Sequence, residues 1–144
     1  MLPRIYDGAV YDYKRILRAY METVTSITAP KAIGPYSQAK IVGNLVFLSG
    51  QIPIDSEIDK VVDGDIKTQT RQIINNIDNI LKSAGTSLKK VIKTTCYLTN
   101  IADFAAFNDV YGEYFVEKPA RTLVIVSALP KGVDAEIEVI AELN

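Results

Sequence analysis

Two spacings of apolar side chains alternate along the chain and predict its helices and strands. Over residues 65–84 apolar positions recur at i, i+4, i+7 and i+8, which predicts a helix with one broad apolar stripe. Gly85 follows directly and suits the C-terminal end of that helix, because glycine tolerates the left-handed conformation found there. Asn100 can cap a second helix over residues 101–115, whose apolar face is largely aromatic.

Runs of β-branched and apolar residues predict the strands. They lie at residues 37–42, 45–49, 91–99, 122–127 and 135–141, with a short additional strand at 60–62. Gly43 and Asn44 predict a hairpin between the first two strands. The order of two strands, helix, strand, helix and two strands predicts an α+β domain with both helices on one face of a mixed sheet. Residues 123–126 are apolar on both sides of their strand, which indicates that another subunit covers the other face.

Residues 1–28 differ from the rest and are interpreted as an N-terminal extension, followed by a single domain over residues 29–144. Apolar positions at helical spacing within it predict a short amphipathic helix: Val10, Tyr13, Ile16, Leu17 and Tyr20. Organelle targeting is one interpretation, but Asp7, Asp12 and Glu22 count against it, because transit peptides contain few acidic residues. The alternative is a segment that packs on the domain or on a neighbouring subunit.

Composition excludes several classes of function. The 144 residues carry a formal net charge of -1 and the pI is near 5.5, so no overall positive field attracts nucleic acid or an anionic membrane. The chain has no histidine and one cysteine, Cys96, which excludes a histidine-dependent triad and an internal disulfide and argues against a zinc site. Cys96 is predicted to be a buried, unreactive thiol.

The chain is expected to be soluble, because no apolar run approaches the roughly 20 residues that span a bilayer. A single cysteine is compatible with a reducing compartment. We therefore expect a cytoplasmic protein, unless the N-terminal extension directs it to an organelle.

Candidate chemistry is concentrated in residues 118–143. Arg121 opens the strand at 122–127, while Glu136 and Glu138 lie two positions apart and therefore share one face of the strand at 135–141. If these two strands are neighbours, a guanidinium and a carboxylate can lie close together near one end of the sheet. The alternative is a surface ion pair of Arg121 with either glutamate.

Several short motifs occur in an order that resembles the RidA (YjgF) family of reactive-intermediate deaminases. They are IGPYSQ at 33–38, SGQIP at 49–53, KTT at 93–95, PART at 119–122, LPKGV at 129–133 and EIE at 136–138. The resemblance extends from about residue 21 to residue 143 and leaves residues 1–20 without a counterpart. It implies a chorismate-mutase-like fold and a homotrimer whose sheets face inward, with clefts between subunits.

The resemblance also implies a reaction and its residues. The family hydrolyses imines and enamines released by pyridoxal-phosphate-dependent dehydratases, such as 2-iminobutanoate and 2-iminopropanoate, to 2-keto acids and ammonia, and so protects pyridoxal-phosphate enzymes. It needs no metal or cofactor. By motif position, Arg121 holds the substrate carboxylate and Glu136 positions or activates water, and Glu138 is structural or solvent-facing. The remaining residues expected in the cleft are Tyr36, Ser49, Gly50, Asn108 and Leu123.

Elementary chemistry agrees with these roles. Arginine carries a planar, permanently charged guanidinium group that can bind a carboxylate with two parallel hydrogen bonds. An imine is already electrophilic, so one carboxylate that moves protons suffices. This chain departs from many relatives in having Leu123 where they have a cysteine, so a role for that thiol is absent here, although backbone groups at the position are retained. The connection at residues 116–118 is also shorter than expected.

Two other functions are weighed against deamination. One is a ribonuclease or translation inhibitor acting on RNA, a role also attributed to some relatives, but the acidic pI and the lack of histidine count against it. The other is a non-catalytic trimer that binds small ligands, which would keep the Arg121 anchor but tolerate Glu136→Gln. The expected partners are therefore a small imino acid with a carboxylate and further copies of this chain, without membrane or nucleic acid.

Overall fold

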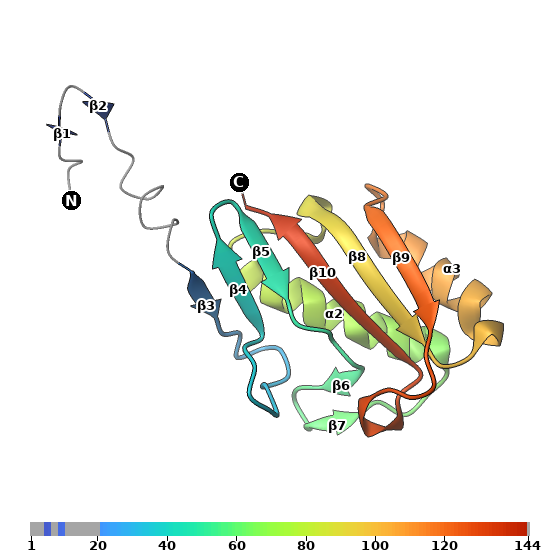
Figure 1. The fold of residues 1–144 in the computed structure, drawn as a ribbon. Helices are drawn as coiled ribbons and strands as arrows, with labels where there is room; N and C mark the ends of the chain where they lie inside the picture. The colour runs from blue at the N-terminus through green and yellow to red at the C-terminus, as the bar shows by residue number, and fades with distance from the viewer. Residues whose placement is uncertain (1–4, 7–8, 11–20, 144) are drawn as a thin grey trace.

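A computed structural model describes residues 5–6, 9–10 and 21–143 of the protein (Figure 1). The amphipathic helix predicted over residues 10–20 lies almost wholly outside these residues. Two short strands, β1 (Ile5–Tyr6) and β2 (Ala9–Val10), pair with each other near the N-terminus. The last part of the predicted extension belongs to the domain, because β3 (Glu22–Val24) pairs with a strand of the central sheet. The rest of the division between extension and domain stays a prediction.

A six-stranded mixed sheet forms the centre of the domain, with strand order β3-β4-β5-β10-β8-β9. Its strands are β3 (Glu22–Val24), β4 (Ala39–Val42), β5 (Leu45–Leu48), β8 (Val91–Leu98), β9 (Ala120–Ile125) and β10 (Ala135–Glu142). All neighbours are antiparallel except β8 and β9, which are parallel. Parallel neighbours require a crossover, and the chain between them supplies it with a helix.

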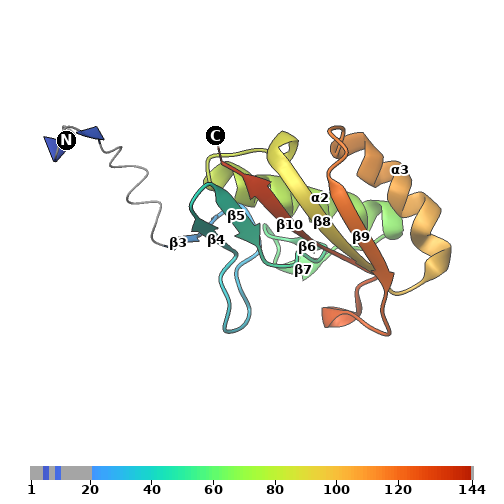
Figure 2. The same ribbon diagram turned by 45° about the horizontal axis from the view of Figure 1, so that its top comes forward.

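Both long helices cover one face of this sheet, as Figure 2 shows. They are α2 (Ile66–Ser83) and α3 (Phe104–Tyr114). The Asp65 side chain caps α2 by accepting from the Thr68 amide at 2.9 Å, and Gly85 follows with φ +85°, as glycine allows. The predicted α+β architecture, with helices on one face of a mixed sheet, is confirmed.

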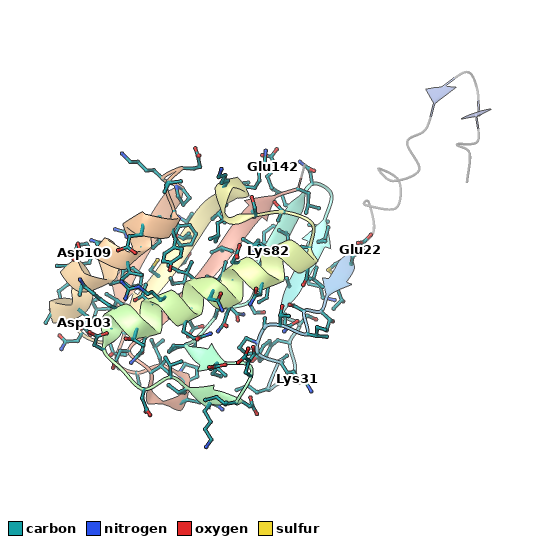
Figure 3. All side chains as sticks on the ribbon, turned by 180° about the vertical axis from the view of Figure 1, so that it is seen from behind. Glu22, Lys31, Lys82, Asp103, Asp109 and Glu142 are labelled. Carbon is teal, nitrogen blue, oxygen red and sulfur yellow. The ribbon has the colours of Figure 1, made fainter. Side chains whose placement is uncertain are left out.

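The core lies between α2 and the sheet. The apolar stripe of α2 supplies most of its large side chains, all fully buried: Ile73, Ile74, Ile77, Ile80 and Leu81. Polar side chains occupy the opposite face of the helices, seen in Figure 3 with Lys82 and Asp109 labelled. Isoleucine lowers the intrinsic helix propensity, so burial of this stripe against the sheet is what stabilises α2.

Short elements complete the domain. β6 (Ile54–Asp55) and β7 (Lys60–Val61) form a separate small sheet, of which only the second strand was predicted. Three 3-10 turns were not predicted: η1 (Leu88–Lys90), η2 (Ile101–Asp103) and η3 (Pro130–Gly132). Asn100 caps η2, because its side chain accepts from the Ala102 amide at 3.0 Å, and α3 begins only after this turn. The predicted strand at 122–127 already begins at Ala120.

The strands that carry Arg121 and Glu136 are not neighbours. β8 lies between them, with Thr94 opposite Arg121 in β9 and Tyr97 opposite Glu136 in β10. Thr94 is buried beneath the helices, so Arg121 shares the helical face, whereas Glu136 alternates with the buried Ala135 and Ile137 and faces the other way. The prediction that Arg121 and Glu136 lie close together within one subunit is therefore wrong.

The face of the sheet opposite the helices is open and partly apolar in the described chain. Phe47 and Val124 lie on it and are each 40% exposed. β9 also ends the sheet and has one edge without a neighbouring strand among the described residues. Exposed apolar side chains beside a free strand edge are typical of a surface that another chain covers.

Candidate active site

A cleft of about 450 Å³ opens on the side of the sheet away from the helices and holds two carboxylates. Its lining is Ile33, Tyr36, Ser49, Gly50, Ile52, Pro130, Glu136 and Glu138; we call it the carboxylate cleft. It forms because residues after β5 run beside β10, with Gln51 and Ile137 exchanging backbone hydrogen bonds of 2.8 and 3.1 Å. This pairing fixes Gly50 next to Glu136.

Gly50 and the carboxylate of Glu136 are in direct contact. A Cβ added to Gly50 would overlap Oε1 of Glu136 and would lie 2.9 Å from its Cδ. Glycine here permits the close approach of the Glu136 carboxylate, and a larger residue would displace that carboxylate; no unusual backbone conformation is involved. The glutamate side chain lies against the glycine backbone, which limits the positions open to its carboxylate.

Tyr36 and Ser49 stand on the rim of the carboxylate cleft, and both are fixed by local hydrogen bonds. Ser49 Oγ donates to the carbonyl of Ser37 at 2.6 Å. Tyr36 follows a tight turn, and its hydroxyl oxygen accepts from the amide of Ile33 at 3.2 Å. Since that oxygen acts as an acceptor, the Tyr36 hydroxyl proton is free to donate to a bound molecule.

Burial raises the pKa of Glu136 above the ordinary range of a glutamate, and the nearby charge of Glu138 raises this pKa further. Glu138, expected to be structural or solvent-facing, is partly buried and lines the same cleft. The Tyr97 hydroxyl donates to Oε1 of Glu138 at 3.0 Å. A carboxyl whose pKa is raised toward neutrality, placed in a cleft, is suited to proton transfer.

Arg121 lies on the helical side, where α3 holds its guanidinium. Its Nη1 donates to Oδ1 of Asn108 at 2.7 Å, and its Cζ lies 4.8 Å from the ring centroid of Tyr111 and 6.0 Å from that of Phe104. Tyr111 is fixed in turn by a 2.7 Å hydrogen bond between its hydroxyl and that of Thr94. We call Arg121, Asn108, Tyr111 and Phe104 the arginine cluster.

The guanidinium keeps further donors for a ligand, because arginine has five N–H groups and the contact with Asn108 uses one. The surface ion pair of Arg121 with Glu136 or Glu138 is wrong, since the sheet separates the groups. Among the described residues, the ion pairs are Lys67–Asp109 and Lys82–Asp78. The predicted site residues thus form two groups on opposite faces of one subunit.

Comparison with known proteins identifies the family. The sequence model of the family described as "Endoribonuclease L-PSP" matches residues 26–143. A RutC family protein of Pyrococcus abyssi is 56% identical over 121 residues, which make up 83% of this chain and 95% of that protein. A Rid family protein of Yersinia pestis has a structure that matches with a TM-score of 0.84 at 47% identity, over 86% of this chain and 100% of that one.

The chain belongs to the RidA (YjgF) family. A further solved relative is TdcF of E. coli, whose crystal structure contains bound serine. It matches with a TM-score of 0.82 at 38% identity, over 85% of this chain and 99% of that one.

Leu123 and Cys96 lie opposite each other in β9 and β8 of this RidA-family domain. Leu123 is partly buried and packs its side chain against the core. Cys96 is fully buried, and burial raises the pKa of its thiol to about 11. The prediction of a buried, unreactive cysteine is confirmed, because a protonated buried thiol is a poor nucleophile.

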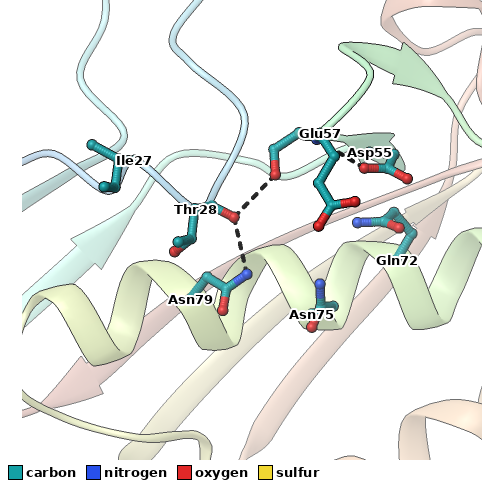
Figure 4. A pocket seen from close by; sticks show the side chains of 8 residues that line it. Ile27, Thr28, Asp55, Glu57, Gln72, Asn75 and Asn79 are labelled. Atoms are coloured by element: carbon teal, nitrogen blue, oxygen red, sulfur yellow. Dashed lines mark hydrogen bonds between the residues drawn. The ribbon is translucent and has the colours of Figure 1, made fainter.

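A second cavity, of about 550 Å³, lies over α2 and is shown in Figure 4. Its lining is polar and carries acidic but no basic side chains: Ile27, Thr28, Asp55, Ser56, Glu57, Gln72, Asn75 and Asn79. The carbonyl of Thr28 accepts from Asn79 Nδ2 at 3.0 Å and from Ser56 Oγ at 3.1 Å. These contacts fix the loop against α2. The lining contains no Lys or Arg side chain that would bind a carboxylate.

Two further properties concern the part of the chain that the structure describes. Within residues 5–6, 9–10 and 21–143, no three His, Cys, Asp or Glu side chains are grouped as metal ligands would be. None of the helices in these residues combines the length and apolar character needed to cross a membrane.

Proposed function

We propose that this RidA-family protein hydrolyses 2-imino acids and their enamine tautomers, such as 2-iminobutanoate and 2-iminopropanoate, to 2-keto acids and ammonia. The observation that carries the proposal is Glu136, a partly buried carboxyl with a raised pKa that lies against Gly50 in the carboxylate cleft. Removal of such reactive imines would protect pyridoxal-phosphate enzymes.

Glu136 performs the proton transfers in this proposal. Water attacks the carbon of the protonated imine, Glu136 takes a proton from that water, and the π electrons of the C=N bond move to nitrogen. Glu136 then returns the proton to the amine nitrogen. The C–N bond breaks, the hydroxyl oxygen forms the carbonyl and its proton passes to solvent, so ammonia and a 2-keto acid leave. A general base of this kind contributes roughly 10²- to 10⁴-fold to rate.

Arg121 anchors the carboxylate of the substrate. Its guanidinium is already oriented by Asn108 and Tyr111, so little freedom is lost when a carboxylate binds. Serine, the molecule bound in the related TdcF structure, carries a carboxylate next to a nitrogen-bearing carbon. A 2-imino acid has the same arrangement of groups, which supports a substrate of this class.

One small molecule cannot reach both groups within a single subunit, because Arg121 and Glu136 face opposite sides of the sheet. The site is therefore proposed to form between subunits of a homotrimer whose open sheet faces point inward. Arg121 comes from one subunit and Glu136 from the next. The exposed Phe47 and Val124 on the open face and the free edge of β9 support this assembly.

The test uses an imino acid generated in solution by a threonine dehydratase, with its decay followed in the presence of the purified protein. Faster decay is expected with the wild type and not with Arg121→Ala or Glu136→Gln. The two variants are then co-produced with different tags, and oligomers containing both are isolated. If each site combines Arg121 from one subunit with Glu136 from the next, every mixed trimer regains one of its three sites, about a third of the wild-type activity.

Each outcome of this experiment has a distinct meaning. Recovery in mixed oligomers establishes both the reaction and the shared site. No recovery, although each mixed oligomer is intact, shows that Arg121 and Glu136 do not combine across subunits. No acceleration by the wild type refutes deamination, and light scattering tests the homotrimer independently of any activity.

The description of the family as an endoribonuclease favours RNA cleavage as a second candidate. The same preparations are therefore incubated with single-stranded RNA. Cleavage by the wild type that persists in Glu136→Gln would indicate a contaminant or a different site. Loss of cleavage in that variant would indicate that RNA is cleaved in the carboxylate cleft.

A further inference from the structure

Tyr97 and Glu138 form a hydrogen-bonded pair beside Glu136 that has no part in the proposed mechanism. In the sheet, Tyr97 lies directly opposite Glu136, and Thr95 lies opposite Glu138. The Tyr97 side chain therefore passes Glu136 and reaches the diagonal neighbour, where its hydroxyl donates to Oε1 of Glu138 at 3.0 Å. Diagonal contacts of this kind are within reach of an aromatic side chain.

This pair keeps a negative charge next to Glu136. The hydrogen bond to Glu138 is the main reason why the pKa of Tyr97 is raised, so the phenol stays protonated and remains a donor. Both glutamates line the carboxylate cleft. Without the phenol, the Glu138 side chain has no described partner on β8 and is free to turn away from Glu136.

We propose that Tyr97 and Glu138 are positioning residues, which hold a fixed carboxylate beside Glu136 so that Glu136 can both accept and return a proton during imine hydrolysis. The proposal rests on the proposed function. The physical reason is that a proton carrier works best when neither its acid nor its base form is strongly favoured at the working pH. A fixed neighbouring charge raises the pKa of Glu136 and brings the carboxyl closer to that condition.

Other charged or titratable groups near the carboxylate cleft do not replace this pair. Tyr36 stands on the rim, and Lys93 lies further along β8, where its Nζ donates to Thr122 Oγ1 at 3.0 Å. In the proposed trimer, Arg121 of the partner subunit faces the cleft and binds the substrate carboxylate. Two more groups are Lys131, which lies within η3 and is exposed, and Asp134, which directly precedes β10 and accepts a hydrogen bond from Gln69.

The experiment compares Tyr97→Phe, Glu138→Gln and the control Glu142→Gln, which removes an exposed carboxylate at the far end of the same strand. Protein labelled with ¹³C at the glutamate carboxyl carbon is titrated by NMR, and the Glu136 signal is identified by its loss in Glu136→Gln. The midpoint for Glu136 is expected to move to lower pH in Glu138→Gln, less far in Tyr97→Phe, and not at all in Glu142→Gln.

Deamination is measured over the same pH range with the uncatalysed decay subtracted. The acidic limb of kcat/KM should move to lower pH in the first two variants. At neutral pH kcat/KM should fall about three- to tenfold, well short of the loss expected for removing the base itself. A purely structural role would lower activity or Tm without moving either titration.

The two measurements separate this inference from the proposed function. An unchanged Glu136 midpoint in folded Glu138→Gln and Tyr97→Phe overturns the inference, whatever the activity. A shifted midpoint with no deamination in the wild type would instead refute the proposed reaction and leave the electrostatic pair in place. Shifts in the titration and in the pH–rate profile together establish the role.

Discussion

Gly50→Ala tests the contact that positions the proposed catalytic carboxylate. The added Cβ would overlap Oε1 of Glu136 and lie 2.9 Å from its Cδ, whereas non-bonded carbon atoms settle at about 3.5–4.0 Å. The backbone of Gly50 cannot move away easily, because both the N–H and the C=O of the adjacent Gln51 are hydrogen-bonded to the backbone of Ile137. The carboxylate must therefore move by about 1 Å, and a displacement of that size costs on the order of 10²-fold in rate.

The assay is imino acid decay, with kcat and KM determined for the wild type, Gly50→Ala and Gly112→Ala. Gly112 is a matched control, because it is exposed on α3 and a Cβ there meets no atom within 4 Å. It should keep full activity and gain stability, by about 0.5–1 kcal/mol, since alanine favours a helix over glycine. Gly50→Ala should lower kcat far more than it raises KM.

The result that would refute this reasoning is clear. If Gly50→Ala folds with an unchanged Tm and keeps kcat within about threefold of the wild type, the position of the Glu136 carboxylate does not limit the reaction. If activity is lost, circular dichroism shows whether Gly50→Ala is still folded. Binding of a carboxylate ligand to Arg121 should be unchanged by the substitution and provides a second check of folding.

Two further predictions concern the two halves of the site. Asn108→Ala removes the hydrogen bond that orients Arg121. The KM for the imino acid should therefore rise about tenfold, in line with about 1.5 kcal/mol for a hydrogen bond to a charged group. An unchanged KM would mean that Tyr111 alone orients the guanidinium. Glu136→Gln should raise Tm at pH 7 but not at pH 3, because a folded-state pKa above the unfolded value makes stability fall as pH rises through that range. Thermal melts at both pH values check this, and equal Tm differences would contradict the raised pKa.

Much of the fold could be predicted from the sequence, because single elements carry strong local signals. The stripe of isoleucines predicted α2 to within a residue or two of its ends, and Gly43–Asn44 predicted the hairpin of β4 and β5. β3 and β6 were missed, since each has too few residues to show a period. The 3-10 turn before α3 was missed because an N-cap signal at Asn100 is the same for either helix type.

The relative positions of the predicted site residues could not be predicted, because they depend on the order and register of the strands and not on the sequence of any one strand. Because β8 lies between their strands, Arg121 and Glu136 are not neighbours, and this follows from the crossover through α3. They face opposite sides because Arg121 is in register with Thr94 and Glu136 with Tyr97, which point to opposite faces of β8. Glu138 was assigned no role in the cleft, because only its diagonal contact with Tyr97 distinguishes it from an ordinary exposed glutamate. Motif order predicted the site residues, and the register of the strands determines which of them lie on the same face of the sheet.

Arg121 and Glu136 are held in place for different reasons, and both reasons are compatible with the proposed site between subunits. Glu136 belongs to the central strand β10, where the alternate positions Ile137 and Val139 are buried beneath α2, so its backbone is fixed by the core. Arg121 is near the free edge of the sheet and is fixed instead by side chains of α3. Each half is already ordered within a single subunit. In the proposed trimer, association would therefore align two rigid surfaces rather than order flexible groups, and electrostatic catalysis is most effective when its groups are preorganised in this way.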